Sequence, residues 1–263
     1  MSKNVLLTAI TPHPPIIIPE VGQEELANAA KTVEGLKILS EEIVSLNPET
    51  IVIVTPHSEF NPYFFSIYKS PLLLGNFANF RAPQVKLEFE NDIEFINELE
   101  SKISEDFIKL NAVSSANLDH GSLVPLYYLA KAGYKGKIVV INYCMLDKDK
   151  HKLFGKMISE TAESLGRNII FIASGDLSHR LKPGAPAGYD PNAKEFDEIV
   201  VSSIKEGKFE EITNMTAQIR QTAGECGYNS LMTAFGVIGD KPDQNKVYSY
   251  EAPFGVGYIV AKL

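Results

Sequence analysis

The feature that most constrains the fold of this chain is a set of short apolar runs without alternating polar residues. Examples are the runs at 51–54 and 169–173, which consist mainly of isoleucine and valine. A strand with one solvated face alternates apolar and polar side chains, whereas a strand covered on both faces does not. The runs therefore predict a parallel or mixed sheet between two layers of helices. Strands are predicted over 4–10, 50–55, 64–68, 137–143, 168–174, 247–251 and 256–262.

Helical patterns separate most of these strands, with apolar residues recurring every three or four positions. No glycine- or serine-rich linker and no block of charge divides the chain. The alternation of strands and helices therefore indicates one α/β domain over residues 1–263. The stretches 70–83 and 180–192 are predicted to be long loops, which in compact domains are often functional. Helices are predicted over 24–45, 91–104, 123–131, 148–165, 193–206 and 224–237.

Charge and apolar run lengths exclude some partners. The chain has 25 basic and 33 acidic residues, a net charge of −8, and no basic run. Phosphate contacts supply most of the affinity for nucleic acid, so we expect no nucleic-acid partner. No run approaches the roughly 20 apolar residues that span a bilayer, so we expect no membrane partner. The short apolar run at 5–10 does not resemble a signal peptide, and Cys144 and Cys226 form no disulfide framework pattern. We therefore expect a cytoplasmic protein with free thiols.

The positions of the five histidines are the most informative feature for function. His13 and His57 each end a Thr-Pro-His tripeptide directly after a predicted strand. Sites in α/β sheets form beyond the carboxyl ends of strands, so two parallel neighbours would direct both imidazoles into one crevice. His179 follows another buried strand, and His120 precedes an apolar helix. His151 lies in a charged helix start, and we expect it on the solvated surface.

Four histidines at element ends indicate a metal site. The close Cys and His spacing of structural zinc sites is absent, as are HExxH and CxxC motifs. Two histidines with one carboxylate would suit non-haem Fe(II), and two further histidines would remain for proton transfer. Residue chemistry does not choose among the carboxylates, because some have other uses: Asp119 could cap a helix, and Glu225 could favour a helix dipole. The candidate carboxylates are Glu59, Asp119, Asp176 and Glu225.

Five short motifs occur in a recognisable order: Thr-Pro-His-Pro-Pro, Pro-His-Ser, Asp-His-Gly, Gly-Asp-Leu-Ser-His and Gly-Glu-Cys-Gly. Together they resemble the class III extradiol ring-cleavage dioxygenases, and more closely their catalytic-subunit type, called LigB. The resemblance runs from His13 to Glu225 and covers most of the chain. It implies a non-haem Fe(II)-dependent dioxygenase that opens the ring of a catechol-type substrate with O2.

The resemblance also implies roles for five residues. His13, His57 and Glu225 would be the iron ligands. His179 would be the base that takes a proton from the catechol hydroxyl, and His120 would assist the oxygen chemistry. The implied partners are a small aromatic diol and O2, and the resemblance is compatible with a homo-oligomer or a small second subunit. Aromatic residues that could line the substrate pocket are Tyr63, Phe64, Phe77, Phe80 and Tyr189.

The Memo-like proteins of the same superfamily provide an alternative, since they keep the fold without established ring-cleaving activity. Cys226-Gly227 resembles their cysteine motif, so the third ligand could be Cys226 rather than Glu225. A cysteine ligand would suit a softer or redox-active copper or iron site better than a catechol dioxygenase. The dioxygenase pattern favours Glu225. A zinc-dependent relative is a further alternative that the histidines do not exclude.

Overall fold

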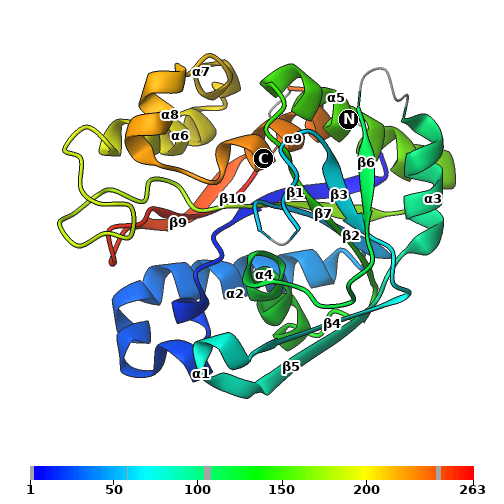
Figure 1. The fold of residues 1–263 in the computed structure, drawn as a ribbon, viewed down its shortest axis with the longest axis horizontal. Helices are drawn as coiled ribbons and strands as arrows, with labels where there is room; N and C mark the ends of the chain where they lie inside the picture. Colours follow the sequence, from blue (N-terminus) through cyan, green and yellow to red (C-terminus); the bar gives the residue numbers. More distant parts are fainter. Residues whose placement is uncertain (1–2, 58, 104–107, 241–243) are drawn as a thin grey trace.

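The apolar runs form an eight-stranded mixed sheet. The computed structural model describes residues 3–57, 59–103, 108–240 and 244–263. The strands are β1 (Val5–Thr11), β2 (Thr50–Thr55), β3 (Phe65–Tyr68), β6 (Leu110–Val113), β7 (Lys137–Asn142), β8 (Ile169–Ser174), β9 (Lys246–Glu251) and β10 (Tyr258–Lys262). Their order across the sheet is β6-β3-β7-β2-β8-β1-β10-β9 (Figure 1). The prediction of a mixed sheet is confirmed.

The centre of this sheet is parallel. Strand β8 lies between β1 and β2 and pairs in parallel with both, and β2 also pairs in parallel with β7. Antiparallel pairs occur further out, between β1 and β10, β10 and β9, and β3 and β7. The carboxyl ends of β1, β8 and β2 therefore meet at one edge of the sheet, the position where α/β proteins build their sites.

Helices cover both faces of the sheet. They are α1 (Pro19–Gly22), α2 (Ala30–Ser45), α3 (Ile93–Lys102), α4 (His120–Lys131), α5 (Lys148–Leu165), α6 (Lys194–Glu206), α7 (Phe209–Thr213), α8 (Ala217–Ala223) and α9 (Tyr228–Ile238). Helices α2 and α4 pack on one face, and α3, α5 and α9 on the other (Figure 1). Within β2, Ile51 and Ile53 pack in the core on the α2 and α4 side of the sheet. Val52 and Val54 pack in the core on the side of α3, α5 and α9. Burial on both faces explains why the strand lacks polar alternation.

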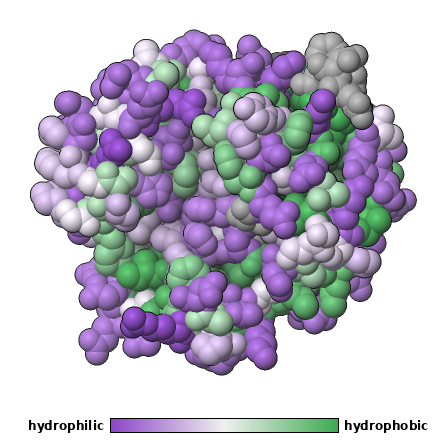
Figure 2. Space-filling model, in the orientation of Figure 1, coloured by the Kyte–Doolittle hydropathy of each residue, from purple (hydrophilic) through white to green (hydrophobic). Residues whose placement is uncertain are grey.

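The surfaces of these helices that face solvent carry polar residues. Figure 2 shows the face seen in Figure 1 as largely hydrophilic, with hydrophobic residues visible over smaller areas. None of the helices in the described ranges is long and apolar enough to cross a membrane. Cys144 and Cys226 are both free thiols.

The prediction of a loop over 70–83 is wrong. This stretch forms β4 (Leu72–Phe77) and the start of β5 (Ala82–Glu90), which pair as an antiparallel hairpin beside α4. Exposed and buried residues alternate along β4, because one side of the hairpin faces the α4 core and the other faces solvent. The stretch 180–192 contains no helix or strand, as predicted.

Two predicted helices start differently. Gln23–Ala29 forms 3-10 turns ahead of α2, and the last predicted helix begins at Tyr228 rather than at 224. Gly224 adopts a left-handed conformation, with φ of 62°, that ends α8 and prevents a continuous helix. Ser104, the predicted end of α3, lies outside the described residues.

The prediction that His151 is solvated is wrong. Its side chain is fully buried in α5, with Nδ1 3.2 Å from the Thr233 hydroxyl and Nε2 3.1 Å from the Cys144 carbonyl oxygen. The ring also packs edge-on against Phe65. Burial lowers the pKa of His151 to about 4. The charged neighbours belong to the outer face of an amphipathic helix whose inner face packs against α9.

Candidate metal centre

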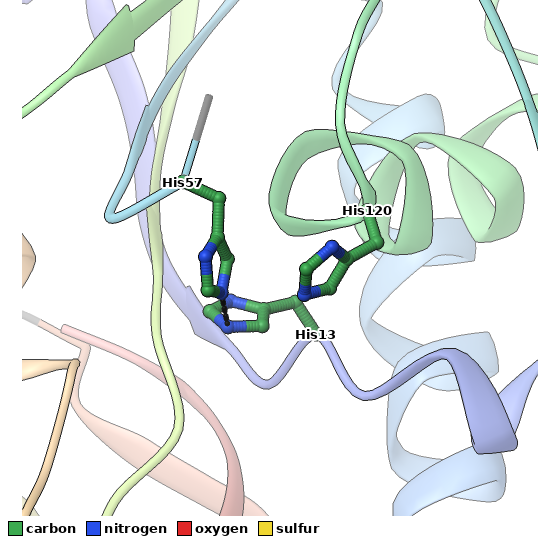
Figure 3. Close-up of side chains that lie close together, drawn as sticks. All are labelled: His13, His57 and His120. Atoms are coloured by element: carbon green, nitrogen blue, oxygen red, sulfur yellow. Dashed lines mark hydrogen bonds between the residues drawn. The ribbon is translucent and has the colours of Figure 1, made fainter. Parts of the chain in front are cut away.

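Three histidines converge at the carboxyl edge of the sheet. His13 follows β1 by two residues, His57 follows β2 by two residues, and His120 opens α4 (Figure 3). The repeated tripeptide suggested that β1 and β2 are neighbours. They are not, because β8 lies between them. Their histidines nevertheless meet because parallel strands end at the same edge. Ser58 of the Pro-His-Ser motif lies outside the described residues.

The three imidazoles are close enough to share one ion. The Nε2 atoms of His13 and His57 are 3.0 Å apart (Figure 3). One nitrogen from each of the three rings lies within 4.8 Å of the others, so that His13, His57 and His120 could hold a metal ion. His13 is buried, and the other two are partly exposed. Solvent therefore reaches part of the cluster at His57 and His120.

Hydrogen bonding fixes the proton of His13 on the nitrogen that faces away from the cluster. Its Nδ1 lies 2.9 Å from the Ser174 hydroxyl, which itself donates to the Gly121 carbonyl oxygen at 2.5 Å. Because that hydroxyl hydrogen is already used, the hydroxyl oxygen accepts from Nδ1–H, and Nε2 keeps its lone pair. Burial and the nearby imidazoles lower the pKa of His13, and burial lowers that of His57 to about 4. Neutral imidazoles are metal ligands.

The segment after β8 adds a carboxylate and a fourth imidazole. One Asp176 oxygen, Oδ2, lies 3.9 Å from Nε2 of His13 and 3.9 Å from Nε2 of His179. Its other oxygen accepts from the His13 backbone N–H at 3.0 Å. Burial raises the pKa of Asp176 to about 7. His179 Nδ1 lies 2.8 Å from the Gly224 carbonyl oxygen, which can only accept, so His179 Nε2 is left to accept a proton.

Long-range contacts hold this segment in place. Asp197 of α6 accepts hydrogen bonds from the Ser178 backbone N–H and the Tyr250 hydroxyl, both at 2.8 Å. The Gly257 N–H donates to the Ser178 carbonyl oxygen at 2.8 Å. A Cβ atom at Gly257 would lie 1.8 Å from an Asp197 oxygen, so only glycine fits. Sequence reasoning missed these supporting residues, because they come from elements far from the histidine motifs.

Glu225 and Cys226 point to different surroundings. The Glu225 carboxylate, 5% exposed, accepts from Arg220 Nε at 3.0 Å and from the Tyr228 backbone N–H at 2.7 Å. The Cys226 sulfur lies 3.7 Å from His13 Nε2 and accepts from the Asp176 N–H at 3.3 Å. The structure therefore brings the thiol beside His13, whereas the neighbouring carboxylate contacts an arginine and a helix N-terminus. Burial raises the pKa of both side chains.

The remaining candidate carboxylates have other surroundings. Asp119 caps α4, since its Oδ1 accepts from the Gly121 N–H at 2.6 Å. Its Oδ2 is buried, with no hydrogen-bond partner among the described residues. Burial raises the pKa of Asp119 to about 6. Glu59 is exposed.

The candidate pocket aromatics divide into three groups. Phe80 packs edge-on against His120, with ring centres 5.5 Å apart. Phe77 is fully buried in the core beneath it. Tyr63 and Tyr189 are exposed, and Phe64 is partly exposed. Phe80 is thus the aromatic side chain of this set that contacts the histidine cluster.

Comparison with known proteins identifies the family. Residues 7–261 match the family model described as the catalytic LigB subunit of aromatic ring-opening dioxygenase. The chain belongs to the LigB family. The resemblance found in the five motifs is thereby confirmed, and relatives of this LigB-family chain include both dioxygenases and MEMO1 family proteins.

Individual relatives differ in length and name. A protein of Clostridium acetobutylicum is 36% identical, over 97% of this chain and 56% of its own length. The 3,4-dihydroxyphenylacetate 2,3-dioxygenase of Escherichia coli is 26% identical, over 95% of each chain. A MEMO1 family protein of Pyrococcus abyssi is 30% identical, over 44% of this chain and 47% of its own. The chain thus spans about half the length of the first relative, and the match to the third covers about half of that protein.

A solved structure supports the fold. The crystal structure of an uncharacterized protein from Escherichia coli superposes with a TM-score of 0.59 and 13% identity, covering 98% of this chain and 99% of that one. At this identity the likeness concerns the fold alone.

Proposed function

We propose that this LigB-family protein is a Memo-like redox metal protein that binds one iron ion through His13, His57 and Cys226. The observation that carries the proposal is the distance of 3.7 Å between the Cys226 sulfur and Nε2 of His13, one of the three clustered histidines. Nitrogen and sulfur donors suit iron, copper or zinc, whereas magnesium and calcium prefer oxygen. When bound, the ion would supply a redox centre at which O2 reacts.

The other titratable groups have roles that follow from their hydrogen bonds. His179 is the proton acceptor, because its Nδ1 is occupied by the Gly224 carbonyl and its Nε2 is free. One Asp176 oxygen lies 3.9 Å from Nε2 of His13 and 3.9 Å from Nε2 of His179, so that its charge acts on both rings. His120 stands at the more exposed side of the cluster, packed on Phe80, where it can exchange a proton with a bound molecule. The chain thus orients the ligands and moves protons around them.

Ring opening of a catechol with O2 is a second candidate function. It is favoured by the free Nε2 of His179, which could take a proton from a catechol hydroxyl, and by the full-length match to a named dioxygenase. The substrate would be a small aromatic diol. A thiolate ligand, if Cys226 supplies one, would favour the Memo-like alternative, since the resemblance to extradiol dioxygenases implies a carboxylate at that position.

Metal analysis tests the ligand set. Protein reconstituted with Fe(II) without oxygen should bind about one ion per chain, and His13→Ala and His57→Ala should each lower iron affinity at least tenfold. Cys226→Ser should also lose affinity, whereas the matched neighbour variant Glu225→Gln should keep it. If Cys226→Ser kept its iron and Glu225→Gln lost it, the third ligand would be Glu225 rather than Cys226. Full iron content in both histidine variants would refute the site.

Oxygen uptake with a panel of catechols, including 3,4-dihydroxyphenylacetate, separates the two functions. The Memo-like proposal predicts no ring-opened product from any of them with the iron-loaded protein. Appearance of such a product, lost again in His179→Ala, would establish ring cleavage instead.

A further inference from the structure

The segment 224–227 presents two consecutive side chains in opposite directions. Glu225 points to Arg220, and Cys226 points to His13. Both residues are potential ligands, but the two side chains cannot face the cluster together while the backbone keeps this conformation. Two sets of contacts therefore bear on which ligand the cluster receives: those that hold the backbone, and those that hold the Glu225 carboxylate away from the cluster.

The backbone of Cys226 is held by the strand-end segment beside it. Its N–H donates to the Asp176 carbonyl oxygen at 3.3 Å, and its own carbonyl oxygen accepts from the Tyr143 hydroxyl at 2.9 Å. A Cβ atom at Gly175 would lie 2.4 Å from the Gly227 Cα, so the two backbones are in direct contact. These bonds fix the backbone of Cys226, whereas the carboxylate of the preceding residue is held by other partners.

Arg220 is the charged partner of that carboxylate. Its Nε donates to Glu225 at 3.0 Å, its guanidinium carbon lies 3.7 Å from the centre of the Tyr228 ring, and one terminal nitrogen lies 3.5 Å from the Asn229 amide oxygen. The planar guanidinium is thus stacked on a ring and bonded at its edge, a geometry that lysine cannot reproduce. The Arg220 side chain, 29% exposed, closes over an almost fully buried carboxylate.

We propose that Arg220 is a positioning residue that withholds Glu225 from the metal and thereby leaves the third coordination position to Cys226. This inference rests on the proposed ligand set. Without its arginine partner the buried carboxylate would keep the Tyr228 N–H as a donor but lose the cation that balances its charge, and a bound metal ion would attract it. Arg220 removes that competition by satisfying the carboxylate 3.0 Å away.

Cobalt-substituted protein provides the test, since a thiolate ligand gives a thiolate-to-Co(II) charge-transfer absorption band that a carboxylate does not. The wild type should show the band and Cys226→Ser should lose it. Arg220→Met should reduce the band about threefold or more while cobalt remains bound, because Glu225 then competes. Arg220→Met combined with Glu225→Gln should restore the band, since the neutral amide still caps α9 but competes poorly for the ion.

The outcomes separate the two proposals. No band in the wild type would refute Cys226 as ligand, and the role of Arg220 with it. A full band in Arg220→Met would overturn only the inference about Arg220. A band lost in Arg220→Met and not restored by Glu225→Gln would also overturn it, because the effect would not pass through the carboxylate. Thermal unfolding by circular dichroism accompanies each variant, and Arg220→Gln replaces Arg220→Met throughout if the latter does not fold.

Discussion

Two histidines of this protein, His13 and His151, are both buried and neutral, but their ring nitrogens have different partners. Burial lowers the pKa of both, so neither carries a charge near neutral pH. His151 has both ring nitrogens within hydrogen-bond distance of the protein, at Thr233 and at the Cys144 carbonyl. His13 has one nitrogen engaged by Ser174 and the other facing further imidazoles and a thiol.

Burial and a lowered pKa therefore do not distinguish the proposed ligand His13 from the core histidine His151. The difference lies in the second nitrogen: a carbonyl and a hydroxyl use both positions of His151, whereas the tautomer of His13 is fixed by a serine so that a lone pair remains. His179 follows the pattern of His13, with a carbonyl at Nδ1 and a free Nε2.

The largest effect is expected at His179, which, like His13, has a lone pair on Nε2. For the second candidate function, ring cleavage, replacing it with alanine should lower O2-dependent turnover of a catechol about a hundredfold or more, since a positioned base is removed. Bound iron should stay at the wild-type level, because His179 is not one of the proposed ligands. Oxygen uptake and metal content are measured on the same preparation, with the aromatic diol that gives the fastest uptake in the wild type. Loss of iron together with activity would make His179 a ligand rather than a base.

A smaller effect is expected from Ser174→Ala, which removes the group that fixes the His13 tautomer. The Nδ1 proton would lose its acceptor, and iron affinity should fall about tenfold. Ser230→Ala is the matched control, because this buried hydroxyl donates to the backbone carbonyls of Ser174 and Val54 and makes no hydrogen bond to an imidazole among the described residues. Competition with a chelator measures both affinities. Equal affinities in the two variants would show that Ser174 does not prepare the ligand.

The sequence predicted the positions of His13 and His57 better than the orientation of Glu225 and Cys226. Apolar runs mark β1, β2 and β8, and residues directly after such runs lie at one edge whenever the strands are parallel. His13 and His57 could be assigned to that edge for this reason. The orientation of the Glu225 and Cys226 pair was not predictable, because it depends on Arg220 and on a backbone contact with Asp176.

The error at His151 has the same origin. Asp147 and Asp149 at the start of α5 are exposed, and this charged local sequence indicated solvent. Burial of the inner face depends on α9, which is distant in sequence and supplies Thr233. The β4–β5 hairpin was missed because the exposed positions of β4 include Leu72 and Leu74, so the sequence lacks the polar alternation that marks a strand with one solvated face. Local sequence patterns predicted the strands that are buried on both faces. The burial of His151 and the β4–β5 hairpin depend on contacts with elements distant in sequence.

The smallest expected effect concerns stability and tests the His151 half of the comparison. The folded-state pKa of about 4 lies below the ordinary 6.5, so the folded state binds the proton less well than the unfolded state. This group's contribution is therefore complete above pH 6.5 and is lost as the pH falls toward 4. For metal-free protein, His151→Gln should lessen the fall in unfolding free energy between pH 6.5 and 5.5 by about 1 kcal/mol. Urea denaturation at several pH values measures the slope, and identical slopes in wild type and variant would show that His151 does not resist protonation in the core.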